Sequence, residues 1–181
     1  MKNNDLKKRF ILIFVCICIA IFADQFTKYL AIEYLKESAS ISIFQGILEL
    51  TYVENYGAAF GILQGGRIFF YIITFVVAVA IVLTLYRMEY KKRFLPFICC
   101  LTMILAGAIG NLIDRIVHGY VVDFIYFVPI DFPVFNVADI YVTVSTGVLF
   151  VLILFYYKED EISFLGKRGA NIASELQSKD E

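Results

Sequence analysis

Four long runs of apolar residues dominate the chain, and shorter stretches rich in charged and polar residues separate them. The runs cover about residues 10–31, 68–86, 95–114 and 139–157. A helix needs about 20 mostly apolar residues to cross the hydrocarbon core of a bilayer, so each run is long enough to span one. The pattern predicts a membrane protein of the all-α class, built as a bundle of four transmembrane helices.

The first run has a second interpretation as a cleaved signal peptide. Lys7, Lys8 and Arg9 precede it, and Asp24 interrupts it. No A-x-A cleavage site follows, and the apolar character resumes at Phe26. A transmembrane helix is therefore favoured over a signal peptide.

The connection over 32–67 is too long for a simple turn, and it alternates in places between apolar and polar residues. Apolar residues recur at every second position over 41–43 and again over 48–52, with a turn signal at Gln45-Gly46. A period of two is typical of strands. We expect a small extracytoplasmic β-sheet here, lying on the outer leaflet.

Lysine and arginine are distributed unevenly between the ends of the runs. They gather before the first run, between the second and third, and after the fourth, whereas the connections 32–67 and 115–138 hold only Lys36, Arg67 and Arg115. Cytoplasmic flanks carry the excess of basic residues. The count predicts that both termini are cytoplasmic and that both connections are extracytoplasmic.

Composition agrees with a single membrane domain over 1–158, followed by a charged cytoplasmic tail over 159–181. Of the residues, 60% are hydrophobic, whereas an ordinary soluble domain is about 45–50% apolar. The net charge of −1 gives no basic field for nucleic acid, so membrane lipid is the partner that composition implies. The cysteines lie in apolar runs without CxxC spacing, which is typical of small core residues and not of a disulfide framework or a metal site. They are Cys16, Cys18, Cys99 and Cys100.

A few charged residues lie within the runs or near their outer ends, and each needs a reason, because a charge at depth costs several kcal/mol unless it is paired or hydrated. The candidates for a role in a site are Asp24, Asp114, Arg115, Asp123 and Asp139. The aspartates all map to the outer ends of their spans. This gathering indicates one site and not a path through the membrane.

Asp123 and Asp139 form the most informative pair. Pro129 and Pro133 lie between them and favour a loop that returns to the membrane surface. Two nearby carboxylates share a proton, so one acts as base on a water while the other acts as acid to a scissile carbonyl. Such a pair hydrolyses a peptide with no metal and no cofactor.

Each member of the pair also has a structural interpretation. Asn136 has the features of a helix N-cap, which places Asp139 at the third helical position, where a carboxylate favours the helix dipole. Asp123 is one loop aspartate, and such residues are commonly only solvated. From these residues alone, capping and catalysis stay open for Asp139.

The third run places Gly107, Asn111 and either Asp114 or Arg115 on one helical face. The glycine favours helix packing, and Asn111 is either a link between helices or part of a site. Arg115 is expected to pair with Asp114 or with a loop carboxylate.

Asp24 has Lys28 one turn beyond it, in the favourable acid-first order of an i,i+4 pair. It either forms that pair or makes a functional contact near the outer leaflet. Asn55 opens a segment with glycines at 57 and 61, which predicts an unusual loop. The lone His118 supplies no zinc set and is typical of a solvated loop residue.

Four blocks occur in order along the chain. They are Asn55-x-Gly57-Ala58-Ala59-Phe60, Gly107-Ala108-Ile109-Gly110-Asn111-Leu112-Ile113-Asp114-Arg115, Val122-Asp123-Phe124 and Phe135-Asn136-x-Ala138-Asp139. Together they resemble the signature blocks of the bacterial lipoprotein signal peptidase family, also called signal peptidase II. The charged extension after about residue 158 is the one departure from the resemblance.

The resemblance implies an intramembrane aspartyl endopeptidase of the bacterial cell membrane, with its active site toward the extracytoplasmic side. It implies Asp123 and Asp139 as the catalytic dyad. Around them it implies Asp24, Asn55, Gly107, Asn111, Asp114, Arg115 and Asn136. The implied substrate is a prolipoprotein whose cysteine carries diacylglyceryl, cleaved before that cysteine, and globomycin-like inhibitors are expected to bind the same site.

Two other functions compete with this one. A small proton-coupled transporter would also use membrane carboxylates, although it would distribute them through the bilayer depth. A scaffold that binds lipid or a partner without catalysis would tolerate replacement of the dyad carboxylates.

Overall fold

The computed structural model describes residues 2–57, 67–88, 91–158 and 161. Its long helices are α1 (Lys2–Leu35), α2 (Arg67–Arg87), α3 (Leu95–Val117) and α4 (Val137–Val151), and α4 continues into the π-helical segment η4 (Leu152–Tyr156). Four helical spans are long and apolar enough to cross a membrane. The predicted four-helix bundle is confirmed, and the tail predicted over 159–181 lies, apart from residue 161, outside the described residues.

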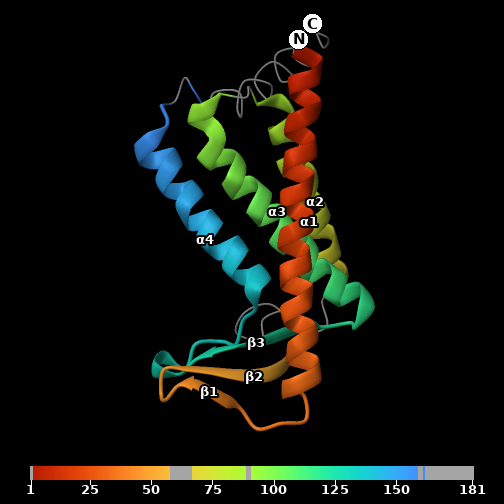
Figure 1. The fold of residues 1–181 in the computed structure, drawn as a ribbon, viewed down its shortest axis with the longest axis vertical. Helices are drawn as coiled ribbons and strands as arrows, with labels where there is room; N and C mark the ends of the chain where they lie inside the picture. Colours follow the sequence, from red (N-terminus) through yellow and green to blue (C-terminus); the bar gives the residue numbers. More distant parts are fainter. Residues whose placement is uncertain (1, 58–66, 89–90, 159–160, 162–181) are drawn as a thin grey trace, which may run out of the picture.

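The centre of the bundle is α3. Half of the residues in the apolar window of its span are buried, against 17% in the window of α1 and 11% in those of α2 and α4. In Figure 1, α3 runs between α1 and α4, with α2 beside it. Buried small residues, Ala106, Gly107 and Gly110, lie on α3 and allow the neighbouring helices to approach closely.

The outward faces of the other three helices are apolar. Phe22 of α1 and Phe75 of α2 are exposed examples, and a helix that is apolar all round is either buried in protein or surrounded by lipid. Cys100 is buried, but the other three cysteines are exposed. The prediction that all four are core residues was therefore wrong for three of them, because lipid and not protein covers these positions.

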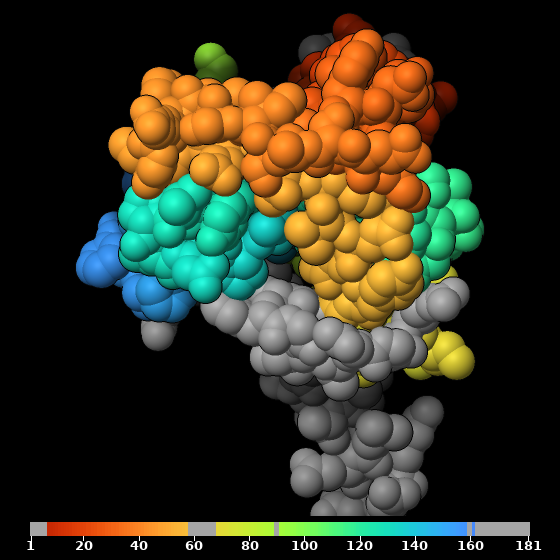
Figure 2. Space-filling view, turned by 90° about the horizontal axis from the view of Figure 1, so that it is seen from below, coloured from red at the N-terminus to blue at the C-terminus, as the bar shows by residue number. Residues whose placement is uncertain are grey.

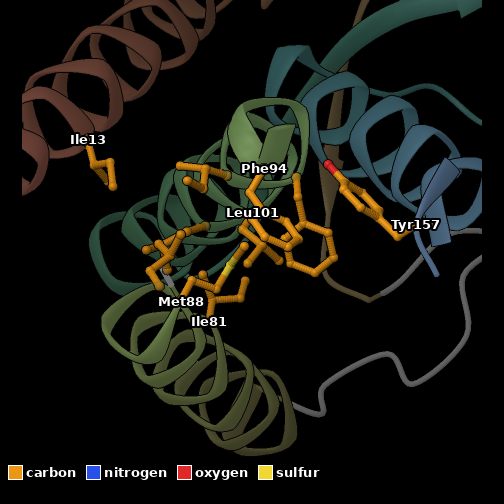
Figure 3. Packing of buried hydrophobic residues seen from close by; sticks show 10 residues of the cluster. Ile13, Ile81, Met88, Phe94, Leu101 and Tyr157 are labelled. Carbon is orange, nitrogen blue, oxygen red and sulfur yellow. The ribbon is translucent and has the colours of Figure 1, made fainter. Parts of the chain in front are cut away.

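An apolar cluster holds the helices together at the end where the N-terminus lies. Figure 3 shows Ile81 and Met88 near Leu101 and Phe94, with Tyr157 packed from the end of the fourth span. At the same end, the buried Arg9 of α1 donates hydrogen bonds to the carbonyls of Leu85 and Met88. These bonds satisfy carbonyls that the end of α2 leaves without helical partners.

A three-stranded antiparallel sheet closes the opposite end of the bundle, which we call the sheet end (Figure 1). Its strands are β1 (Ile41–Phe44), β2 (Leu48–Asn55) and β3 (Val121–Phe127), in that spatial order. Gly46 supports the turn between β1 and β2 at a φ of 70°, where glycine carries no steric cost. The hairpin expected from alternation is confirmed, and Figure 2 shows it covering the ends of the helices.

Strand β3 corrects the sequence analysis, which took all of 115–138 as a loop and Asp123 as a loop aspartate. Val121, Val122 and Phe124 are buried, so the strand is covered on both faces and lacks the alternation that marks a half-exposed strand. Asp123 lies opposite Val53 of β2 in this strand. Asp123 is therefore held by a ladder of hydrogen bonds.

Gly107 and Gly147 provide a matched test of the helix packing. A Cβ at Gly107 would lie 2.5 Å from the Ala138 carbonyl oxygen of α4, whereas nothing lies within 4 Å of one at Gly147. Gly107→Ala should lower the stability of the protein by about 1–3 kcal/mol through overpacking. Gly147→Ala should leave it equal or raise it by up to about 1 kcal/mol through helix propensity. Thermal unfolding in detergent measures both, and equal midpoints would contradict the packing described.

Candidate active site

Asp123 and Asp139 reach the same place from different elements. Asp123 projects from β3, and Asp139 lies in the first turn of α4. The segment between them returns to the sheet, because Phe135 and Ile125 exchange backbone hydrogen bonds in both directions. That pairing places Asn136 between the two carboxylates: its Nδ2 donates to Asp123 Oδ1 at 2.6 Å and its backbone N donates to Asp139 Oδ2 at 3.2 Å.

Two further amides hold the remaining carboxylate oxygens. Asn55 Nδ2, at the end of β2, donates to Asp123 Oδ2 at 2.7 Å. Asn111 Nδ2, on α3, donates to Asp139 Oδ1 at 2.8 Å. Each carboxylate is therefore fixed by two donors, which come from β2, from α3 and from Asn136, the residue that precedes α4.

Asn136 is also the N-cap of α4. Its Oδ1 accepts from the backbone N of Asp139 at 3.0 Å, and together with the return bond from its own backbone this forms a capping box. The two interpretations that the sequence left open for Asp139 are thus compatible in geometry. The cap that starts the helix also fixes the orientation of the carboxylate.

The electrostatics of Asp123 favour a bound proton. Burial and the negative charge of Asp139 raise the pKa of Asp123 to about 7, against the opposing effects of Asn55, Asn136 and Lys28. Asp123 is almost fully buried. A carboxylic acid with a pKa near neutrality can hold a proton at working pH and give it up in a reaction.

The two carboxylates open onto a cavity of about 360 Å³. Its polar lining comes from Asn55, Asn111, Arg115, Asp123 and Asp139. Its apolar walls come from Phe132, Pro133, Phe135, Ile140 and Val144. A second cavity of about 260 Å³ lies between α2, α3 and α4 and shares Asn111, Arg115, Asp139 and Thr143 with the first. Asp139 therefore lines both cavities, whereas Asp123 lines the first, and apolar walls with a few polar groups are typical of a binding pocket.

Within the described residues, Arg115 forms an ion pair with neither of its two expected partners, Asp114 or a loop carboxylate. Its guanidinium donates to the carbonyls of Asn111 and Gly57, at 3.3 and 3.1 Å, and lies 4.3 Å from the centre of the Phe70 ring. Consecutive residues on a helix point in divergent directions. Arg115 therefore reaches the cavity, and Asp114 turns toward α1.

Asp114 instead joins a buried ionic group that we call the Lys28 cluster, composed of Asp24, Lys28 and Asp114. Lys28 Nζ lies 3.0 Å from Asp24 Oδ2 and 2.9 Å from Asp114 Oδ2. The predicted pair of Asp24 with Lys28 is confirmed. Asp24 also accepts from the backbone N of Ala138 at 2.9 Å, and Asp114 accepts from the backbone N of Val122 at 3.0 Å.

Lys28 is a residue of this site that the sequence analysis did not select. It was treated only as the structural partner of Asp24, yet its Nζ also donates to Asn111 Oδ1 at 2.9 Å. A signal was present, because Lys28 and Asp114 are opposite charges in apolar runs and each needed a partner. Sequence spacing could not show that the partner of one was the other.

The remaining predicted residues occupy supporting places. Gly107 lies against the Ala138 carbonyl and so packs α3 on the start of α4. Asn55 Oδ1 accepts from the backbone N of Gly57 at 2.9 Å, which begins the expected unusual turn. The rest of that segment, 58–61, lies outside the described residues.

Comparison with known proteins gives one consistent result. The family described as signal peptidase (SPase) II matches residues 16–155. A lipoprotein signal peptidase of Brevibacillus brevis is 46% identical over 131 residues, which cover 72% of this chain and 87% of the relative. One of Enterococcus faecalis is 41% identical over 150 residues, covering 82% and 89%. A solved bacterial membrane enzyme structure, determined by the in meso method at 2.3 Å resolution, superimposes with a TM-score of 0.73 at 33% identity, covering 79% of this chain and 87% of that one.

The Lys28 cluster makes a prediction about stability. Asp114→Ala removes one of the two carboxylates that compensate a buried ammonium, and it leaves the backbone N of Val122 without its acceptor. Breaking a buried pair from one side costs about 3–5 kcal/mol. Glu54→Ala is the control, because it removes a carboxylate from the partly exposed pair with Lys36. Thermal unfolding in detergent should show a large loss for Asp114→Ala and little change for Glu54→Ala, and equal losses would contradict the burial of this charge cluster.

Proposed function

This chain belongs to the signal peptidase II family, and from that membership we propose that it is an aspartic endopeptidase in which Asp123 and Asp139 carry the reaction. Its reaction is the removal of signal peptides from lipoproteins within a membrane. One observation supports the aspartic mechanism above all others. Two carboxylates from separate elements, the buried Asp123 and the partly buried Asp139, meet around Asn136 at the wall of a cavity, with one amide donor on each outer oxygen.

The proposed mechanism assigns different protonation states to the two carboxylates. Asp123 holds the proton, because its pKa is raised to about 7. We assign the ionised state to Asp139, because it sits at the amino end of α4, where the helix dipole favours negative charge. Asp139 takes a proton from a water as the water oxygen bonds to the scissile carbonyl carbon, and Asp123 gives its proton to the carbonyl oxygen. Asp139 then returns its proton to the peptide nitrogen, and Asp123 takes back a proton from a hydroxyl of the tetrahedral intermediate as the C=O bond re-forms. The C–N bond breaks, the amine leaves, and both carboxyl groups regain their starting states.

The cavity walls support a lipid-bearing substrate. Ile140 and Val144 lie on α4, and Phe132 and Phe135 lie on the segment that returns from the sheet. These apolar surfaces suit a prolipoprotein whose cysteine carries diacylglyceryl, cleaved on the amino side of that cysteine. Globomycin-like inhibitors would occupy the same cavity. We place this end of the bundle outside the cytoplasm, because the basic residues gather at the other end and in the flanks beside it.

The transporter alternative is not favoured. The relatives that the chain matches are peptidases, and the aspartates gather at the sheet end. Asp24 and Asp114 share one ammonium, and Asp123 and Asp139 share one amide residue.

The dyad is tested by isosteric substitution. Asp123→Asn or Asp139→Asn should slow cleavage of a purified, diacylglyceryl-modified prolipoprotein by about 10²–10⁴-fold or more, the usual contribution of a general acid or base. An asparagine at position 139 still accepts a hydrogen bond from Asn136, so the cap survives. Asp131→Asn is the control, since Asp131 lies in the same returning segment but contacts Tyr126. Near-normal cleavage by either dyad variant would overturn the aspartic mechanism.

The pH profile tests which carboxylate holds the proton. If Asp123 is the acid, cleavage should decline as the pH rises through about 7, where its proton is lost. The Asn55 amide lowers the pKa of Asp123 by stabilising the carboxylate. Asn55→Ala should therefore raise that pKa and move the alkaline decline of kcat to higher pH. The Asp131→Asn control should keep the original profile, and an Asn55→Ala profile that moves to lower pH would contradict the assignment.

A further inference from the structure

The Lys28 ammonium has a full set of acceptors. It is almost fully buried on α1, and its Nζ lies 3.0 Å from Asp24 Oδ2, 2.9 Å from Asp114 Oδ2 and 2.9 Å from Asn111 Oδ1. A lysine ammonium carries three N–H donors. Two of them are directed to carboxylates that neutralise the charge, and the third is directed to the amide that touches Asp139.

The Asn111 amide can therefore face only one way. Its Oδ1 accepts from Lys28 and, at 3.2 Å, from Asn136 Nδ2, while its Nδ2 donates to Asp139 Oδ1 at 2.8 Å. A reversed amide would point its NH₂ group at an ammonium and its oxygen at a carboxylate. Both contacts would be repulsive inside a site where charges are poorly screened.

The carboxylates around Lys28 also hold the residue that precedes each dyad aspartate. Asp24 Oδ1 accepts from the backbone N of Ala138, the neighbour of Asp139. Asp114 Oδ2 accepts from the backbone N of Val122, the neighbour of Asp123. One ammonium thus joins α1 and α3 to the backbone positions beside both reacting carboxylates.

From these contacts we propose that Lys28 is a positioning residue for signal peptide cleavage, which fixes the Asn111 amide toward Asp139 and holds the backbone beside both dyad aspartates through Asp24 and Asp114. The proposal rests on the aspartic mechanism given above. Lys28 does not line either cavity. It acts through Asn111 and the two carboxylates, not as a group of the cavity wall.

A positioning role predicts an electrostatic signature that a purely structural role does not. The charged groups around the dyad are Asp24 and Lys28 from α1, Asp114 and Arg115 from α3, Asp123 from β3 and Asp139 from α4. Among them, the positive charge of Lys28 lowers the pKa of Asp123. Removal of that charge should raise the pKa and move the alkaline decline of kcat to higher pH.

The first test compares Lys28→Met with Arg9→Met in the purified full-length protein. Both changes remove a buried basic residue from α1, but Arg9 lies at the opposite end and contacts the end of α2. Lys28→Met should lower kcat by about 100-fold, as expected for a misplaced reacting group, with a smaller change in KM and an alkaline decline at higher pH. Arg9→Met should reduce thermal stability and keep the pH profile. A Lys28→Met enzyme with the wild-type kcat and pH profile would overturn the proposal.

A second variant tests the proposal in the case that Lys28→Met does not fold. The Lys28 cluster carries one positive and two negative charges, hence a net charge of −1. The double variant Asp24→Asn/Lys28→Met keeps that net charge, and the asparagine introduced at position 24 can still accept from the backbone N of Ala138. It should cleave at least about tenfold more slowly than Asp24→Asn alone, in which Lys28 still orients Asn111. Equal rates for the two would overturn the proposal.

Asp123→Asn is measured beside these variants, so that the aspartic mechanism and the positioning role of Lys28 are tested separately. If Asp123→Asn remains active, the aspartic mechanism fails and the positioning role fails with it. If Asp123→Asn is inactive while the Lys28 variants match their references, the mechanism stands and only the role of Lys28 is wrong.

Discussion

A single buried ammonium between two carboxylates constrains the architecture of the sheet end. Burying Lys28 without compensation would cost several kcal/mol, so α1 must bring it to Asp24 on its own preceding turn and to Asp114 on α3. The carboxylates in turn need donors on their other sides, and they take them from the backbone N–H groups at Val122 and Ala138. The requirement to satisfy one charge thereby ties the start of α4 to α1 and the start of β3 to α3.

The need to satisfy buried polar groups also determines the start of α4. A helix leaves its first N–H groups without partners, and Asn136 and Asp139 satisfy them through a reciprocal capping box. Those bonds use one oxygen of Asp139 and leave the other to Asn111. The hydrogen bonds that cap α4 therefore also orient the Asp139 carboxylate. This double use explains why capping and catalysis were equal interpretations of the sequence.

Features with a local cause could be predicted from the sequence. Helix lengths follow from the thickness of a bilayer, and the β1–β2 hairpin follows from a period of two and the glycine at 46. Strand β3 could not be predicted this way, since its buried faces remove the alternation. The ion pair of Lys28 with Asp114 was also missed, because it joins residues of α1 and α3 whose rotation about their axes is set by tertiary packing. Cysteine burial was misjudged for a related reason: in a bundle this small, most apolar positions face lipid.

The surrounding lipid also explains why polar contacts determine so much of how the helices associate. Apolar side chains gain little by leaving lipid for a protein interior, so helix association depends on close packing at small residues and on satisfied polar groups. At one end of this bundle the helices meet through an apolar cluster. At the sheet end they meet through an ammonium, its carboxylates and three asparagine amides. A polar group there finds no alternative partner in lipid, so each hydrogen bond has one favourable geometry. Two neighbouring carboxyl groups need such a rigid setting if one is to keep a proton while the other stays ionised.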